Sequence, residues 1–226
     1  MSRLNHANFF RRWTVAVPTT GALGASLLAA LAGCSSAPSR LEPANIDASG
    51  AASGAMTAYD KDSDGFVAGA ELDGAPSLKA SMETLDLNKD GKVDADEIVK
   101  RIEAWKASRI GVATLNCMVT LDGRPLPGAL VTFEPEPFLG DAIKKGDGET
   151  TSFGIAAPTV AKENRVPADA PAGMQPGLYL VRITKSNNGA ESIPARYNTA
   201  TTLGQQVALD DPAMAAQRVK FELKSK

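Results

Sequence analysis

The spacing of hydrophobic residues changes along the chain. Residues 21–33 form one apolar run that only Ser26 interrupts. Ile98, Ile102 and Trp105 recur at i, i+4 and i+7, which is the spacing of one face of a helix. Downstream of this face the period shortens to two, which is the spacing of strands with one buried face. The pattern therefore predicts an apolar leader, then a helical segment, then a strand-rich segment.

Seven apolar runs in the C-terminal half of the chain predict strands. Along the first run Leu115, Cys117 and Val119 alternate with other residues, so Cys117 is expected as a small buried side chain rather than a reactive thiol. Turn residues and prolines separate the runs, as in an antiparallel β-sandwich. Residues 141–149, which include several charged groups, are expected to form an exposed loop. The seven runs cover residues 115–121, 129–133, 153–156, 178–184, 193–197, 206–209 and 218–223.

Two twelve-residue segments repeat one pattern of oxygen-bearing side chains. Residues 60–71 and 86–97 both follow D-x-D-x-D-G-x5-E, with Asn88 in the second ligand position of the second segment. Calcium takes six to eight oxygen ligands, and a loop of this length can supply them from both side chains and backbone. The expected ligands are Asp60, Asp62, Asp64, Phe66 (through its carbonyl) and Glu71 in the first loop, and Asp86, Asn88, Asp90, Lys92 (through its carbonyl), Asp94 and Glu97 in the second.

This repeated pattern resembles a pair of EF-hands. The resemblance implies two bound Ca²⁺ ions, with Gly65 and Gly91 at the sharp sixth position and with Val67 and Val93 paired in a short ribbon. The alternative for one such segment alone is a solvated Asp-rich turn, but two complete matches favour calcium. Ala68 stands at the ninth position of the first loop, where a water is expected to fill the ligand position.

The helices around these loops are expected to be short. Residues 72–85, between the loops, number only fourteen and include Gly74 and Pro76, so the first helix there must end early. The helix that precedes the first loop has only Met56 and Tyr59 as large anchors. This spacing departs from that of sensor-type pairs, and no Met-rich face is present. The short spacing predicts that no large groove opens. Calcium is expected to be structural, because it can be abundant in an extracytoplasmic space.

The N-terminal residues resemble an export signal. Arg3, Arg11 and Arg12 are the only formally charged residues before Cys34, and the apolar run behind them is shorter than the roughly 20 residues that span a bilayer. The run ends in Leu31-Ala32-Gly33-Cys34, which resembles the lipobox of bacterial lipoproteins. That resemblance implies a lipid on Cys34 as the mature N-terminus. The alternative is a free cysteine inside an uncleaved anchor helix, and the export route, Sec or twin-arginine, is left open.

These features divide the chain into four segments: a signal peptide (1–33), a flexible tether (34–54), an EF-hand pair (55–108) and a β-sandwich (110–226). We therefore expect an α+β, multidomain protein, with a small helical EF-hand pair followed by an antiparallel seven-stranded β-sandwich. The lipid on the cysteine would anchor it to a membrane, on the periplasmic side or at the cell surface. Ser35 favours sorting to the outer membrane in cells that have one.

Part of the strand-rich segment resembles a known family. Residues 119–133, Val-Thr-Leu-Asp-Gly-Arg-Pro-Leu-Pro-Gly-Ala-Leu-Val-Thr-Phe, resemble the first hairpin of carboxypeptidase-regulatory-like domains, and residues 177–183, Gly-Leu-Tyr-Leu-Val-Arg-Ile, resemble a later strand of these domains. The family's Thr-Asp element corresponds to Thr151-Ser152-Phe153-Gly154, which lacks the acid. The resemblance implies a transthyretin-like sandwich of the kind that serves as a stalk or interaction module.

The amino-acid composition argues against several classes of function. The net charge of −2 and the aromatic content of 5% argue against a nucleic acid partner. The only histidine, His6, lies in the leader, so Ser-His and Cys-His nucleophiles are not expected and a hydrolase is disfavoured. We expect a calcium-binding, membrane-anchored lipoprotein without enzymatic activity. The alternative is a cell-envelope interaction or adhesion module whose sandwich binds a surface protein.

Overall fold

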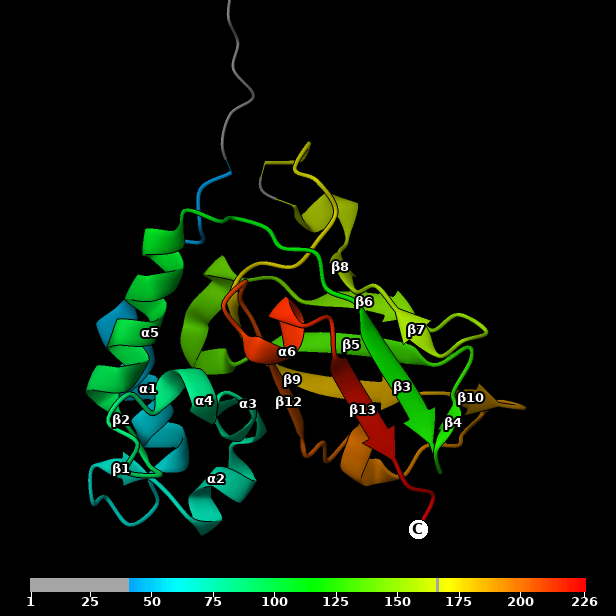
Figure 1. Ribbon diagram of the computed structural model, residues 1–226, viewed down its shortest axis with the longest axis horizontal. Helices are drawn as coiled ribbons and strands as arrows, with labels where there is room; N and C mark the ends of the chain where they lie inside the picture. The colour runs from blue at the N-terminus through cyan, green and yellow to red at the C-terminus, as the bar shows by residue number, and fades with distance from the viewer. Residues whose placement is uncertain (1–40, 166) are drawn as a thin grey trace, which may run out of the picture. The chain divides into compact units, whose positions relative to one another are not determined.

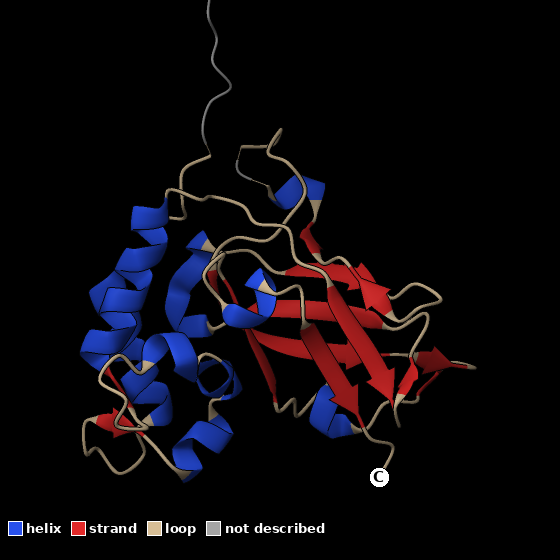
Figure 2. Cartoon of the chain, in the orientation of Figure 1, coloured by secondary structure: helices blue, strands red, loops and turns tan. Residues whose placement is uncertain are grey.

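The computed structural model describes residues 41–165 and 167–226, so the leader and Cys34 lie outside the described residues. Residues 39–226 form one compact unit. Within it, helices gather at one side and strands at the other (Figures 1 and 2). We call residues 41–110 the helical part and the described residues from 111 onward the sheet part. None of the helices in the described ranges is both long and apolar enough to cross a membrane.

The helical part contains five helices and a two-stranded ribbon. Helix α5 begins with a capping box, in which the Asp94 side chain accepts from the backbone of Glu97 and the Glu97 side chain accepts from the backbone of Asp94. On α5 the residues Ile98, Ile102 and Trp105 are buried, as their spacing predicts. The elements are α1 (Ala48–Tyr59), β1 (Phe66–Val67), α2 (Ala70–Gly74), α3 (Pro76–Ala80), α4 (Met82–Leu85), β2 (Val93–Asp94) and α5 (Ala95–Ser108).

Helix α1 is longer than its few large apolar residues suggest. It runs for 12 residues, and the face that it buries consists of small side chains, among them Ala51, Ala52 and Ala55. Small residues let neighbouring elements approach closely, so packing rather than large anchors stabilises this helix. At Gly54 an added Cβ would lie only 2.9 Å from Cβ of Phe138. The sequence between the loops does form short helices, α2, α3 and α4, as expected.

The sheet part consists mainly of two sheets that pack face to face (Figure 1). The first has the order β12 (Leu203–Val207), β9 (Gly177–Thr184), β5 (Leu130–Pro135), β6 (Gly146–Glu149) and β8 (Thr159–Val160). The second has the order β13 (Val219–Leu223), β3 (Cys117–Leu121) and β4 (Arg124–Pro125), with β7 (Ile155–Ala156) also paired to β3. Smaller elements are β10 (Ser186–Asn187), β11 (Ala190–Glu191), α6 (Pro212–Ala215), and the 3₁₀ helices η1 (Pro137–Ala142), η2 (Lys162–Asn164) and η3 (Ala195–Tyr197).

Aromatic rings fill the space between the two sheets. Phe133 of β5 lies 5.9 Å from Tyr179 of β9 and 6.2 Å from Phe221 of β13, measured between ring centroids. Both contacts are edge-to-face, the arrangement that aromatic pairs prefer. Cys117 is buried beside this core, and burial raises the pKa of its thiol to about 12. The expectation of a small buried side chain at this position is therefore confirmed.

The strand predictions were right for six of the seven apolar runs and wrong for one. The run at 193–197 forms η3 instead, because Pro194 starts a turn in which the amide of Tyr197 donates to the Pro194 carbonyl. The expected loop at 141–149 contains strand β6. The pairing is antiparallel except at one edge, where β13, which follows β12 of the other sheet and α6 along the chain, runs parallel to β3.

Candidate metal centre

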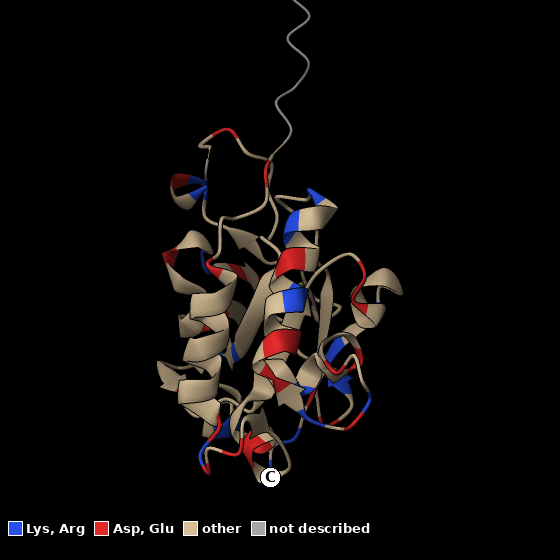
Figure 3. Cartoon of the chain, turned by 90° about the vertical axis from the view of Figure 1, so that its left-hand side faces the viewer, with Lys and Arg blue, Asp and Glu red and all other residues tan. Residues whose placement is uncertain are grey.

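The two Asp-rich loops, residues 60–71 and 86–97, lie side by side. Strands β1 and β2 join them as an antiparallel ribbon, in which Val67 pairs with Val93 and both valines are fully buried. Phe66 pairs with Asp94, and the ammonium of Lys92 lies 4.5 Å from the centroid of the Phe66 ring. Figure 3 views the molecule from this helical side, where acidic segments of the chain are shown in red. The ribbon confirms the predicted pairing of the two loops.

The first loop gathers three carboxylates. Oxygens of Asp60, Asp62 and Glu71 all lie within 4.8 Å of one another. Oδ1 of Asp60 is buried and has no hydrogen-bond partner. A buried carboxylate oxygen without a donor is costly unless a cation neutralises it, so this oxygen fits a metal ligand. Asp64, the remaining acid predicted as a ligand of this loop, is exposed and does not belong to the group.

Backbone amides hold the side chains of the first loop in place. The amide of Gly65 donates to Oδ2 of Asp60 (3.1 Å), and the amide of Phe66 donates to Oδ1 of Asp64 (2.9 Å). Glu71 accepts from the amides of Lys61 (2.6 Å) and Ala68 (3.1 Å). The hydrogen bond from Ala68, followed by that from Lys61, lowers the pKa of the Glu71 carboxyl, so the group is ionised at neutral pH.

The second loop has the same pattern of hydrogen bonds from backbone amides, but Asn88 stands where the first loop has Asp62. The amide of Gly91 donates to Oδ2 of Asp86 (2.9 Å), and Glu97 accepts from the amides of Leu87 (2.9 Å) and Asp94 (3.2 Å). The amide of Asp90 donates to Oδ1 of Asn88 (2.9 Å), and Nδ2 of Asn88 donates in turn to Asp90 (3.0 Å). Among the residues that the structure describes, this loop does not bring three carboxylates as close together as the first, because an amide takes the second ligand position.

Both loops turn at the glycine that the pattern predicts. Gly65 has φ of 89° and Gly91 has φ of 79°, values that side chain-bearing residues rarely adopt. Ser63 and Lys89, at the fourth position of each loop, also have positive φ. The two loops therefore share backbone conformation as well as sequence. The carbonyls of Phe66 and Lys92 belong to residues at the same position of the two loops, the seventh.

Sequence reasoning did not find the residues of the sheet part that support the loops. Glu136, between β5 and η1, is fully buried and accepts hydrogen bonds from the hydroxyls of Tyr59 (2.8 Å) and Ser77. Desolvation by burial raises the pKa of the Glu136 carboxyl, although the bonds from Ser77 and Tyr59 oppose that shift. A lone glutamate outside any motif carries no signal in the sequence, because its partners are 59 and 77 residues away along the chain.

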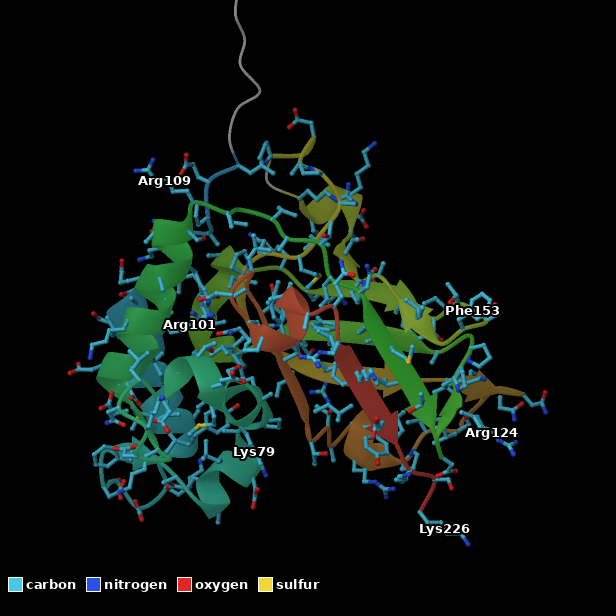
Figure 4. The ribbon with its side chains drawn as sticks, viewed as in Figure 1. Lys79, Arg101, Arg109, Arg124, Phe153 and Lys226 are labelled. Carbon is cyan, nitrogen blue, oxygen red and sulfur yellow. The ribbon has the colours of Figure 1, made fainter. Side chains whose placement is uncertain are left out.

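A second polar contact joins the two parts at α5. Arg101 is 6% exposed, and it donates to Oε1 of Gln206 (2.6 Å) and, through both terminal nitrogens, to Asp210 (2.7 Å each). Gln206 is fully buried and donates to the hydroxyl of Thr84 (3.0 Å). The hydrogen bond from Arg101 lowers the pKa of the Asp210 carboxyl. Figure 4 shows Arg101 on α5, at the opposite end of the molecule from Phe153.

Neither the protein-family models nor the curated proteins contain a match to this chain. In the first loop the Asp-rich motif, the three gathered carboxylates and the unpartnered Asp60 oxygen coincide.

Proposed function

We propose that this protein binds Ca²⁺ through an EF-hand pair formed by the two loops. The observation that carries this proposal is the buried Oδ1 of Asp60, which has no donor and lies in a group with Asp62 and Glu71. All of these ligands are oxygens, which suits a hard cation such as calcium. The shared backbone turn at Gly65 and Gly91 supports extending the assignment to the second loop.

Calcium has a structural role in this proposal. The apolar residues that a sensor would expose on opening are already buried here, among them Leu78, Leu85, Ile98 and Ile102. They belong to the same hydrophobic core as residues of the sheet part such as Val207. Opening the helices would therefore require this core to be separated, which disfavours a calcium-dependent groove.

The protein is further proposed to be an envelope lipoprotein without enzymatic activity. The leader and the lipobox-like tetrapeptide ending at Cys34 support a membrane anchor and export from the cytoplasm, with the outer membrane favoured by Ser35. The face-to-face sheets support a transthyretin-like β-sandwich in the sheet part. The lack of histidine outside the leader supports a binding rather than a catalytic role.

Calorimetric titration of the chelator-treated protein tests calcium binding. We expect two sites, of which Glu71→Gln removes the first and Glu97→Gln the second, because each substitution takes one oxygen from the residue that closes the ligand shell. Glu222→Gln, an exposed carboxylate on β13, is the matched control and should leave both sites unchanged. The absence of heat, together with an unchanged melting temperature on adding calcium, would contradict the proposal.

A second candidate function is supported by an exposed aromatic side chain. Phe153 is 72% exposed at the end of the sheet part (Figure 4), and aromatic residues, Phe among them, are enriched at protein–protein interfaces. If the sheet part binds an envelope protein there, Phe153→Ser should reduce the capture of that protein by the purified chain at least fivefold. Leu209→Ser, at another exposed apolar residue, is the control. Equal capture by both variants and the unaltered chain would argue against this function.

A further inference from the structure

In each loop, the two flanking segments are joined by one buried side chain of the sheet part. For the first loop this side chain is Glu136, which accepts from Tyr59 at the end of α1 and from Ser77 on α3. Tyr59 immediately precedes Asp60, and Ser77 lies just beyond the short helix α2 that leaves the loop. One carboxylate therefore fixes the start of the loop relative to the segment that follows it.

Gln206 occupies the corresponding place for the second loop. It donates to Thr84 on α4, two residues before Asp86, and accepts from Arg101 on α5, one helical turn after Glu97. Both Gln206 and Glu136 are fully buried. A buried polar group that loses its partner costs free energy, so each side chain favours the one spacing of the flanks that keeps both its bonds.

We infer that Glu136 and Gln206 are positioning residues for calcium, each setting the affinity of its own loop. The inference rests on the proposed function, and it deepens it by assigning control of the two sites to side chains of the sheet part. The first ligand of each loop directly follows one flank, and the last ligand lies on the second flank (Glu97 on α5) or on the short helix next to it (Glu71 on α2). Holding the flanks in place therefore reduces the reorganisation that binding requires. By thermodynamic reciprocity, calcium in each loop should in turn strengthen the contact with the sheet part.

Two hydroxyl deletions test the inference, because each nearly preserves the shape of the side chain. Tyr59→Phe removes the bond to Glu136, and Thr84→Val removes the bond from Gln206 together with the local bond from Thr84 to the carbonyl of Ser81. In the full chain carrying Glu97→Gln only the first loop can bind, and there Tyr59→Phe should weaken calcium binding about fivefold or more, measured by calorimetry with CaCl₂. In the chain carrying Glu71→Gln, Thr84→Val should weaken the second loop to the same extent. In the opposite combinations, Thr84→Val in the Glu97→Gln chain and Tyr59→Phe in the Glu71→Gln chain, the calcium affinity should stay within twofold of that of the parent chain.

Matched controls separate positioning from a general loss of structure. Tyr197→Phe and Thr202→Val remove hydroxyls whose hydrogen bonds lie within the sheet part, and they should leave both affinities unchanged. In Gln206→Glu the carboxylate accepts from Arg101 as Gln206 does, and the Thr84 hydroxyl can rotate to donate to it instead of accepting, so this variant should retain the affinity that Gln206→Leu loses. Equal weakening of both loops by each deletion, or of neither loop, would overturn the inference while leaving calcium binding intact. If the two parent chains bind no calcium at all, the proposed function itself fails.

Discussion

Replacing Gly204 by alanine is expected to destabilise the protein by about 3 kcal/mol. Gly204 lies on β12, where an added Cβ would be 2.2 Å from the carbonyl oxygen of Pro76 and 2.4 Å from the nitrogen of Ser77. Both are backbone atoms of α3, so no side-chain rotation can relieve the overlap, and the helix would have to move off the strand. Urea unfolding, followed by circular dichroism, measures the loss.

Gly74→Ala is the control for this substitution. Gly74 lies in α2 with no atom within 4 Å of the added Cβ, and its φ is not positive. Alanine should therefore be neutral or stabilise the protein by up to about 1 kcal/mol, because it restricts the unfolded chain and favours helix. Equal stability of the two variants would show that α3 and β12 are not in the close contact described.

Much of the secondary structure could be predicted from the spacing of hydrophobic residues. This was possible only where an element buries apolar side chains, and not where glycines occupy the buried positions. The helical face of Ile98, Ile102 and Trp105 and the alternation along β3 both reflect burial of one face. Strand β6 has no such pattern because Gly146 and Gly148 occupy it. At Gly146 an added Cβ would lie 2.2 Å from the sulfur of Met174, so close packing excludes the side chains that would have revealed the strand.

The position of the two loops, their turns at Gly65 and Gly91 and their mutual pairing could be predicted, because a single short segment encodes each loop. Glu136 and Gln206 could not be predicted in the same way. Their partners come from other parts of the chain, and Gln206 lies 122 residues from Thr84 and 105 from Arg101. Polar residues within strands and at their ends are also common without any such contact. Only the tertiary structure distinguishes Glu136 and Gln206 from the other polar residues of the strands.

Calcium is expected to raise the stability of the whole unit, not only that of the helical part. At a calcium concentration one hundred times the dissociation constant, each occupied loop adds about 2.7 kcal/mol, so two independent loops add about 5 kcal/mol. Residues of the helical part, such as Ala55 and Leu78, share one hydrophobic core with Tyr179 and Val207 of the sheet part. The two parts should therefore unfold together.

Differential scanning calorimetry with and without CaCl₂ measures this effect. In the chain carrying Trp13→Phe, intrinsic tryptophan fluorescence comes from Trp105 and reports on the helical part. The fluorescence and calorimetric transitions should coincide and move together to higher temperature when calcium is added. Adding both Glu71→Gln and Glu97→Gln should abolish the shift without changing the calcium-free transition by a comparable amount. Two separate transitions, with only the lower one sensitive to calcium, would contradict a shared core. In that case the bonds of Glu136 and Gln206 could not transmit calcium binding to the sheets, since the two parts would separate before the sheets unfold.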